Sequence, residues 1–263
     1  MKRIVSVIFL SFVVLSVTGQ QKNSRGEKLV SKLDISTYGI DIHNKIFDKS
    51  QICYQYSGKT IVGAVCSMRS KVSYDEVYEV TLRNNKIYRT PYKLYYEYNL
   101  NKVGKVINKK KRMRRGIYTN YDYVYDDKNR LVNLSVRDYF RNWFGEYVPS
   151  DVAHGWDIKW IDGNGYIDGY GMEFSDYDND INVNLNVFLL LSVIDEVFGN
   201  EAFEHSIDWF GMRSDKLLEK ITDSNCNYTI KYIFDEKKNL SEVNLFRIVK
   251  DEQRLYRTIK VFY

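Results

Sequence analysis

The feature that most constrains this chain is a short sequence pattern that returns along most of its length. The stretch "YDYVYDDKNRLVNL", residues 121–134, alternates tyrosine with other residues, breaks at two aspartates, and resumes with an apolar run. Further copies occur at 54–62, 78–88, 95–106, 157–170, 228–243 and 249–256. Alternation places one set of side chains on one face of a strand, and Asp, Asn or Gly permits a tight turn. Each unit therefore predicts one β-hairpin.

The predicted turns are unevenly spaced. They fall near Ser57, Arg83, Asn99, Asp126, Asp162, Asp235 and Asp251. Propellers and solenoids need a fixed period, so an antiparallel meander fits better. The 23 tyrosines and only 2 prolines also favour pleated strands. We expect an all-β, mainly antiparallel fold, a curved meander sheet or partial barrel of about 12 strands. The sheet should curl because long sheets twist and because a flat open sheet would leave exposed edge strands, which proteins avoid.

One segment lacks the alternation and predicts helix. Residues 185–210 carry long apolar runs, and Gly199 separates two helices at about 185–198 and 200–210. One face of the first helix gathers Val187, Leu190, Leu191 and Ile194. Such a stripe is typical of a helix packed on a sheet. We expect this two-helix insert to lie in the concavity of the curved sheet.

The N-terminus reads as an export signal. Lys2 and Arg3 precede an apolar run of about fourteen residues, shorter than the roughly twenty that a membrane-spanning helix needs. We predict a signal peptide over 1–19, cleaved after Gly19, and a single β-rich extracytoplasmic domain over 20–263. An uncleaved N-terminal anchor is the alternative. The predicted location is secreted or periplasmic.

A family resemblance rests on the Tyr-x-Tyr-x-Tyr-Asp unit at 121–126 and the related unit at 228–235. It also rests on the order of "YDNDINVNLNVFLLL", "WFGMRSDKLLEKIT" and a last tyrosine hairpin. The chain resembles secreted Bacteroidota domain-of-unknown-function proteins with a porin-like fold and hairpin repeats of the tyrosine-aspartate type. The resemblance implies an all-β extracytoplasmic domain and carries over no catalytic residue. Many such proteins have a lipobox cysteine near the cleavage site, which this chain lacks.

Cysteine spacing leaves a disulfide open. Cys53 and Cys66 flank one predicted hairpin, where a four-residue loop would place them on a diagonal. A bridge between them then requires a bulge that shifts the register. Cys226 is interpreted as a buried thiol.

Tryptophans are the candidates for carbohydrate binding. Exposed aromatic rings on a sheet offer flat faces to sugars, and the candidates are Trp143, Trp156 and Trp160. A position in the core is the alternative for each of them.

A basic run is the candidate for binding polyanions. Its members are Lys109, Lys110, Lys111, Arg112, Arg114 and Arg115. Clustered cations attract phosphate or sulfate groups, whereas a solvated hairpin loop explains the same composition without a ligand. Because no aromatic residue interleaves the run, nucleic acid is not an expected partner.

Catalytic, metal and cofactor sites are not predicted. Asp162, Asn164 and Glu173 match a calcium loop only in part, and "DGNGY" is better explained as a tight turn. His154 between Asp151 and Asp157 is interpreted as an exposed loop histidine. No enzyme is expected, although the paired carboxylates of a glycoside hydrolase need only proximity in space, which sequence does not give.

The pattern as a whole indicates a secreted or periplasmic binding or structural module. Its partner would be a glycan or a cell-envelope polymer, with no stable membrane insertion. One alternative is an outer-membrane β-barrel, because Leu255, Ile259, Val261 and Tyr263 alternate as in the last strand of such barrels. The other is a surface protein that binds polyanions through the basic loop 109–115.

Overall fold

The protein folds into strands that follow one another along the chain. This computed structural model describes residues 29–38, 46–58, 60–70, 76–84, 86–90, 96–112, 116–175, 214–222 and 227–263. The predicted signal peptide, the predicted helices at 185–210, Arg114, Arg115 and Cys226 lie outside the described residues. Within those ranges, no helix has the length and apolar character to cross a membrane.

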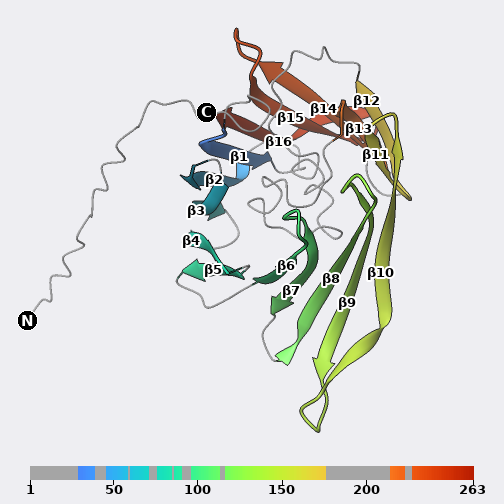
Figure 1. Ribbon diagram of the computed structural model, residues 1–263. Helices are drawn as coiled ribbons and strands as arrows, with labels where there is room; N and C mark the ends of the chain where they lie inside the picture. Colours follow the sequence, from blue (N-terminus) through green and yellow to red (C-terminus); the bar gives the residue numbers. More distant parts are fainter. Residues whose placement is uncertain are drawn as a thin grey trace, which may run out of the picture.

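The described residues form sixteen strands (Figure 1). These are β1 (Lys32–Tyr38), β2 (Ile46–Ser57), β3 (Thr60–Ser70), β4 (Glu76–Arg83), β5 (Lys86–Thr90), β6 (Tyr96–Leu100), β7 (Val106–Arg112), β8 (Tyr118–Tyr125), β9 (Leu131–Arg141), β10 (Tyr147–Ile161), β11 (Asn164–Ile167), β12 (Gly171–Ser175), β13 (Leu217–Thr222), β14 (Asn227–Phe234), β15 (Leu240–Val249) and β16 (Glu252–Phe262). The predicted all-β antiparallel fold is confirmed. The expected number of about 12 strands was too low, chiefly because β1, β12 and β13 were not recognised as strands.

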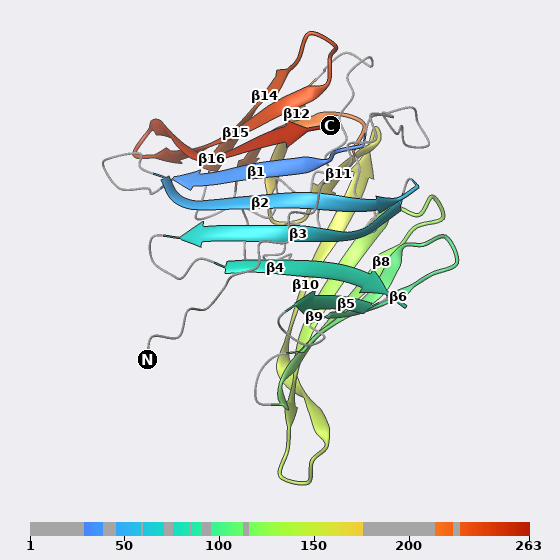
Figure 2. The same cartoon turned by 90° about the vertical axis from the view of Figure 1, so that its left-hand side faces the viewer.

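The strands form one curled sheet in which nearly every neighbour in sequence is a neighbour in space. The order is β11-β10-β9-β8-β7-β6-β5-β4-β3-β2-β1-β16-β15-β14-β13-β12. The first strand pairs antiparallel with the last, with Ile35 opposite Ile259 and Leu33 opposite Val261. Figures 1 and 2 show that successive strands turn progressively, so that the sheet is strongly curved. The only interruption among the described strands is the seam between β11 and β12.

Irregular backbone covers this seam. The Asp215 amide donates to the Gly163 carbonyl over 3.0 Å, and the Lys216 amide donates to Asn164 Oδ1 over 2.9 Å. The Gly165 amide also donates to Ser214 Oγ over 3.1 Å. The chain that leads into β13 therefore runs beside β11 and satisfies part of an otherwise open edge, as stable sheets require.

The inner face of the sheet holds the core. Alternating residues of successive strands are buried, and the most completely buried apolar ones are Leu33, Ala64, Val106, Leu131, Leu134, Leu218, Leu240, Val243 and Leu245. Five tyrosines of the repeated units, Tyr96, Tyr98, Tyr121, Tyr123 and Tyr228, lie in the same cluster. Burying each such side chain stabilises the fold by about 1.5–3 kcal/mol. The outer face is largely polar.

Four hairpin turns share one five-residue geometry. They span residues 101–105, 126–130, 142–146 and 235–239. In each, the first residue is Asn or Asp, and its Oδ1 accepts hydrogen bonds from the amides of the third and fifth residues. The fourth residue has a positive φ, which Gly and Asn adopt most readily. The Asp and Asn of the sequence pattern are thus the residues that close the turns.

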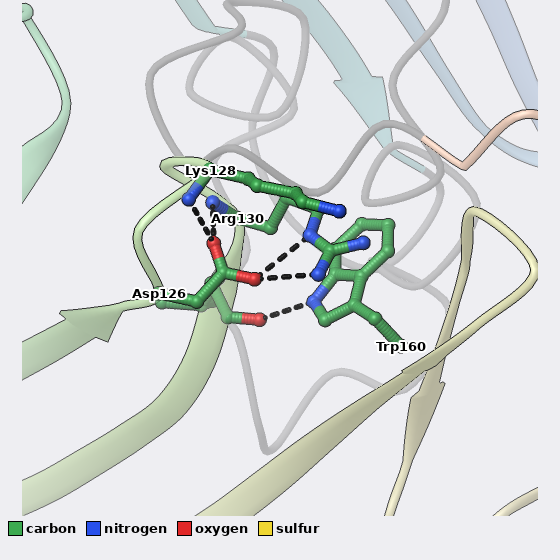
Figure 3. Close-up of polar contacts among 5 residues, drawn as sticks. Asp126, Lys128, Arg130 and Trp160 are labelled. Atoms are coloured by element: carbon green, nitrogen blue, oxygen red, sulfur yellow. Dashed lines mark hydrogen bonds and ion pairs between the residues drawn. The ribbon is translucent and has the colours of Figure 1, made fainter.

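The opening stretch of the pattern shows this turn in most detail (Figure 3). Asp126 Oδ1 accepts from the Lys128 and Arg130 amides at 3.0 and 2.8 Å, and Oδ2 pairs with the Arg130 guanidinium at 2.7 Å. Burial acts to raise the pKa of Asp126, but hydrogen bonds from Arg130, its positive charge and the Lys128 amide outweigh burial and lower that pKa. The Asp126 carboxylate is therefore a structural group that fixes the turn.

Aromatic side chains tie hairpins together by a second recurring contact. Each donates a hydrogen bond to the carbonyl of a buried residue at or near the start of a strand. The pairs are Tyr56 to Val30 (2.6 Å), Tyr125 to Val106 (2.7 Å), Trp160 to Leu131 (2.7 Å), Tyr232 to Leu218 (2.6 Å) and Tyr263 to Leu240 (3.0 Å). These five aromatic residues therefore satisfy backbone carbonyls where strands begin.

Candidate functional site

The basic run lies mostly in a strand. Residues 109–112 belong to β7, so the expected loop over 109–115 was wrong for this part. Lys109 lies opposite the buried Tyr98 and Tyr121, which places it on the inner face. The register places Lys111 on the inner face as well, while Lys110 and Arg112 alternate to the outer face. The run is thus divided between the core and the surface.

Lys109 is part of the core. Its side chain is 1% exposed, and its Nζ lies 4.5 Å from the ring centre of Tyr96 and 4.7 Å from that of Tyr121. Rings at these distances attract an ammonium group, most strongly where water is excluded. Lys109 is therefore not accessible to a ligand on the outer face.

An aromatic cluster stands beside Arg112 on the outer face, with Tyr118 at its centre. Tyr118 lies opposite both Arg112 and Tyr139 in the ladders of β8. Its ring stacks on Tyr139, with 4.6 Å between centroids and 7° between planes, and meets Tyr147 edge-on at 4.9 Å. Lys110 Nζ lies 3.7 Å from the Tyr118 ring centre. The three aromatic rings beside the basic run thus come from three different strands, β8, β9 and β10.

The Tyr118 phenol stays protonated at neutral pH. Burial, and then the neighbouring Tyr139 and Tyr147, raise the pKa of Tyr118 above its ordinary value. A neutral phenol can donate a hydrogen bond to an anionic or hydroxyl oxygen.

These residues line a surface cavity of about 400 Å³, formed by Lys110, Arg112, Gly116, Ile117, Tyr118 and Tyr147. The Arg112 side chain is 60% exposed, and Tyr147 is 48% exposed. Glu97 lies 4.0 Å from Arg112, at the limit of an ion pair, and 3.5 Å from Lys86. Glu97 is thus shared between two cations, and the cavity itself is lined by Lys110 and Arg112, so positive charge exceeds negative charge among these residues.

The cavity has the chemistry to hold an acidic sugar. A guanidinium binds carboxylate, sulfate or phosphate through paired hydrogen bonds, and Lys110 adds a second cation. The half-exposed Tyr147 ring offers an apolar face against which a sugar ring can stack. A few convergent polar groups around an apolar surface are what small-molecule sites commonly present.

The structure does not bring the three candidate tryptophans together. Trp143 is fully exposed at the tip of the β9–β10 hairpin. Trp160 donates to the Leu131 carbonyl and packs against Arg130, whose guanidinium carbon lies 5.0 Å from the ring centre (Figure 3). Trp156 also packs against the core and lies beside the exposed His154, with ring centroids 6.5 Å apart. Trp156 and Trp160 therefore serve packing.

The structure has no disulfide between Cys53 and Cys66. A disulfide between them would need a bulge that shifts the register of the hairpin. Such a bulge is present, but it places Cys53 opposite Val65 and Cys66 opposite Ile52. The two cysteines then project from opposite faces of the sheet, because neighbours along a strand alternate. Burial, opposed by Lys32 and reinforced by Asp34, raises the pKa of the Cys53 thiol. This thiol is therefore a weak nucleophile at neutral pH.

Metal-binding groupings are not seen in the described ranges. No cluster of three His, Cys, Asp or Glu residues there could hold a metal ion. Asp162 and Gly163 form a two-residue turn with positive φ at both positions, as expected for "DGNGY".

Sequence reasoning missed Tyr118, Tyr139 and Tyr147. The available signal was the alternation of β8, which gives Tyr118 the parity opposite to that of the buried Tyr121 and Tyr123. If the strand that contains Tyr118 had also been paired with the strand that contains the basic run, Tyr118 would have been placed beside Arg112.

The features above define an all-β, antiparallel protein with a barrel-like sheet and a cation–aromatic cavity on its outer face. Its fold is similar to that of a porin-like protein from Bacteroides uniformis ATCC 8492, with a TM-score of 0.59 and 12% identity over 90% of this chain and 98% of that chain. A porin-like protein from Bacteroides vulgatus ATCC 8482 also matches, at 12% identity and a TM-score of 0.33 over 89% and 98% of the two chains. No protein-family model matches the chain, and no curated protein matches it in sequence. The expected porin-like fold is confirmed, while membership of a repeat family stays a prediction.

Proposed function

We propose that this protein is an extracytoplasmic, envelope-associated binding module that takes acidic carbohydrate at the Tyr118 cavity. The observation that carries the proposal is the meeting of Lys110 and Arg112 with Tyr118 and Tyr147 around one open cavity. Lys110 and Arg112 were predicted to bind polyanions. The aromatic rings beside them are tyrosines, whereas the sequence analysis had proposed tryptophans as the sugar-binding rings.

The proposed compartment rests on two independent features. The first is the predicted signal peptide over 1–19, with cleavage after Gly19. The second is the likeness in fold to a porin-like protein of Bacteroides. Both support a secreted or periplasmic protein associated with the cell envelope.

The polarity of the outer face supports exposure to water over insertion in a bilayer. On β7 and β8, Asn108 Nδ2 donates to Asn120 Oδ1 and Asp122 Oδ1 at 2.9 and 2.6 Å. On β1 and β2, Asp34 binds Gln51 and Lys32 at 2.8 and 3.1 Å. An outer-membrane barrel needs an apolar outward band instead.

The alternation in the last strand has an explanation in the core. Ile259 and Val261 are 1% and 6% exposed and pair with Ile35 and Leu33 on the inner face. These apolar residues therefore fill the interior, and they do not favour the outer-membrane alternative.

An acidic sugar unit satisfies both parts of the cavity. Its charged group would lie between Lys110 and Arg112, and its ring would pack on Tyr147. A neutral sugar would leave the two cations without a counter-charge. Hydrogen bonds between charged groups contribute about 1.5–3 kcal/mol, roughly tenfold or more in affinity.

The test is a glycan array probed with the chain lacking residues 1–19. The site variant is Lys110→Ser/Arg112→Ser. The matched control is Lys102→Ser/Lys237→Ser, which removes the same charge from two exposed turn positions. We expect the wild type and the control to bind acidic glycans and the site variant to lose roughly tenfold or more in signal. Equal binding by the site variant, or binding of neutral glycans alone, would contradict the proposal.

A further inference from the structure

The β9–β10 turn carries a pair of exposed aromatic residues that its geometry does not require. Trp143 is 102% exposed and Phe144 is 90% exposed. The same two positions hold Lys102-Val103, Asp127-Lys128 and Glu236-Lys237 in the three other turns of this geometry. Exposing two large apolar side chains is unfavourable in water. Contact of Trp143 and Phe144 with an apolar environment outside the protein would therefore be favourable.

The turn is held in a fixed shape. Asn142 Oδ1 accepts from the Phe144 and Glu146 amides at 3.0 and 2.9 Å, and Gly145 has a φ of 84°. Arg141 Nε donates to the Gly145 carbonyl at 3.2 Å. The aromatic pair is thus presented by a braced turn, so little conformational freedom is lost when it binds.

The hairpin projects from the rest of the molecule. Figures 1 and 2 show β9 and β10 extending past the ends of the neighbouring strands, with their turn at the extremity. A projecting tip reaches a flat surface before any other part of the sheet does.

Basic side chains stand behind the tip on the outer face. Arg141 directly precedes the turn, and Arg137 shares its face. Lys110 and Arg112 lie on the same face through their pairing with Asn120 and Tyr118. At about 3.3 Å per residue, the Arg112–Tyr118–Tyr139 row lies about 10 Å behind the turn.

Acidic groups near the tip are engaged by neighbours. Asn142 Nδ2 donates to Glu146 Oε2 at 3.3 Å, and Asp138 accepts from Thr119 Oγ1 at 2.6 Å. These hydrogen bonds leave both carboxylates charged, but Asp138 lies opposite the buried Thr119 on the inner face. On the outer face, the cations Lys110, Arg112, Arg137 and Arg141 outnumber the neighbouring Glu97 and Glu146, so positive charge exceeds negative charge among these residues.

We infer that Trp143 and Phe144 insert into the interfacial region of an anionic lipid bilayer while the basic side chains behind them contact the headgroups. Tryptophan favours this region because its ring is amphipathic, and basic residues near the surface add attraction to anionic lipids. The spacing from tip to charges matches the 5–10 Å over which interfacial elements enter a bilayer. Two side chains are too small for a stable protein interface, which buries about 800 Å² per partner.

The test is co-sedimentation of the chain lacking residues 1–19 with phosphatidylcholine vesicles, made with or without phosphatidylglycerol. The tip variant is Trp143→Ser/Phe144→Ser, and the matched control is Glu236→Ser/Lys237→Ser in the equivalent turn. We expect the wild type and the control to bind vesicles containing phosphatidylglycerol, and the tip variant to bind at least about tenfold more weakly. Tryptophan emission of the wild type should shift to shorter wavelength on binding.

Three results would overturn the inference. They are absence of wild-type binding to either vesicle, equal binding by the tip variant, and self-association that depends on Trp143 in analytical ultracentrifugation. Binding of the tip variant to acidic glycans is measured in parallel. Retention of that binding keeps the lipid test independent of the proposed carbohydrate site.

Discussion

The Tyr125 hydroxyl donates a 2.7 Å hydrogen bond to the carbonyl oxygen of Val106, the fully buried residue that begins β7. Tyr125 ends β8, so the contact joins the end of one strand to the start of its neighbour. Four other aromatic residues make the equivalent contact elsewhere in the sheet. The recurring tyrosines thus fasten strand starts as well as filling the core.

Removal of one such hydroxyl should destabilise the fold while leaving its shape intact. We expect Tyr125→Phe to lower the free energy of unfolding by about 1 kcal/mol, because it leaves a buried carbonyl without this donor. Tyr88→Phe, at a ring 39% exposed, is the control and should change stability little. Urea denaturation measures both, and equal stabilities for the two variants would contradict this role.

Tyr56 should make stability depend on alkaline pH. Burial raises the pKa of Tyr56 from 10.0 to about 12. The folded phenol therefore stays protonated where the unfolded phenol ionises, so its contribution to stability falls as pH rises between these values. Tyr56→Phe should be about 1 kcal/mol less stable than wild type at neutral pH, with the difference narrowing above about pH 10. A constant difference up to about pH 11 would contradict this pKa.

Asp126 should make stability depend on acidic pH in the opposite sense. Its pKa is lowered in the folded state, so its contribution is full above the ordinary value for Asp and is lost as pH falls through the folded value. Asp126→Asn keeps the acceptor of the turn, as Asn101 and Asn142 show, but loses the charge that pairs with Arg130. We expect a loss of about 0.5–1 kcal/mol at neutral pH. The two proteins should become equally stable in acid. If their free energies of unfolding still differed there, the loss would come from a change in the geometry of the turn and not from the missing charge.

The seam between β11 and β12 can be probed at two glycines. Gly163 and Gly169 both have positive φ, so alanine strains both by about 1 kcal/mol. A Cβ at Gly163 also meets the Asp215 carboxylate, whereas a Cβ at Gly169 meets nothing within 4 Å. Gly163→Ala should therefore lower the thermal midpoint more than Gly169→Ala does. Equal midpoints would mean that residues 214–216 do not cover β11 in solution.

The hairpins were predictable because the information is local. Alternation and an Asx residue located the turns at Asp126, Asp162 and Asp235 correctly, and the turn expected near Asn99 lies at Asn101. The turn at Asn142 was missed because Trp143 and Phe144 occupy positions where polar residues were expected. Its signal was the Asn-x-x-Gly spacing.

The seam and the cavity were not predictable for a different reason. The bond between Gly165 and Ser214 joins residues 49 positions apart, and no pattern in the chain marks them as neighbours. The cavity needs the registers of β7, β8, β9 and β10 together, and a shift of one residue in any of them would move Tyr118 or Tyr139 to the other face. Lys109 illustrates the same limit, since its burial depends on parity within a run that is basic throughout.

The central claim is that the Tyr118 cavity recognises the charge of a sugar acid. Calorimetric titration with oligogalacturonate and with its methyl ester tests it most directly, because the two ligands differ only in that charge and its esterification. The account predicts that the acid form binds at least about tenfold more tightly than the ester and that Arg112→Ser removes this preference. Equal affinity for the two forms, or a preference that survives in Arg112→Ser, would contradict it.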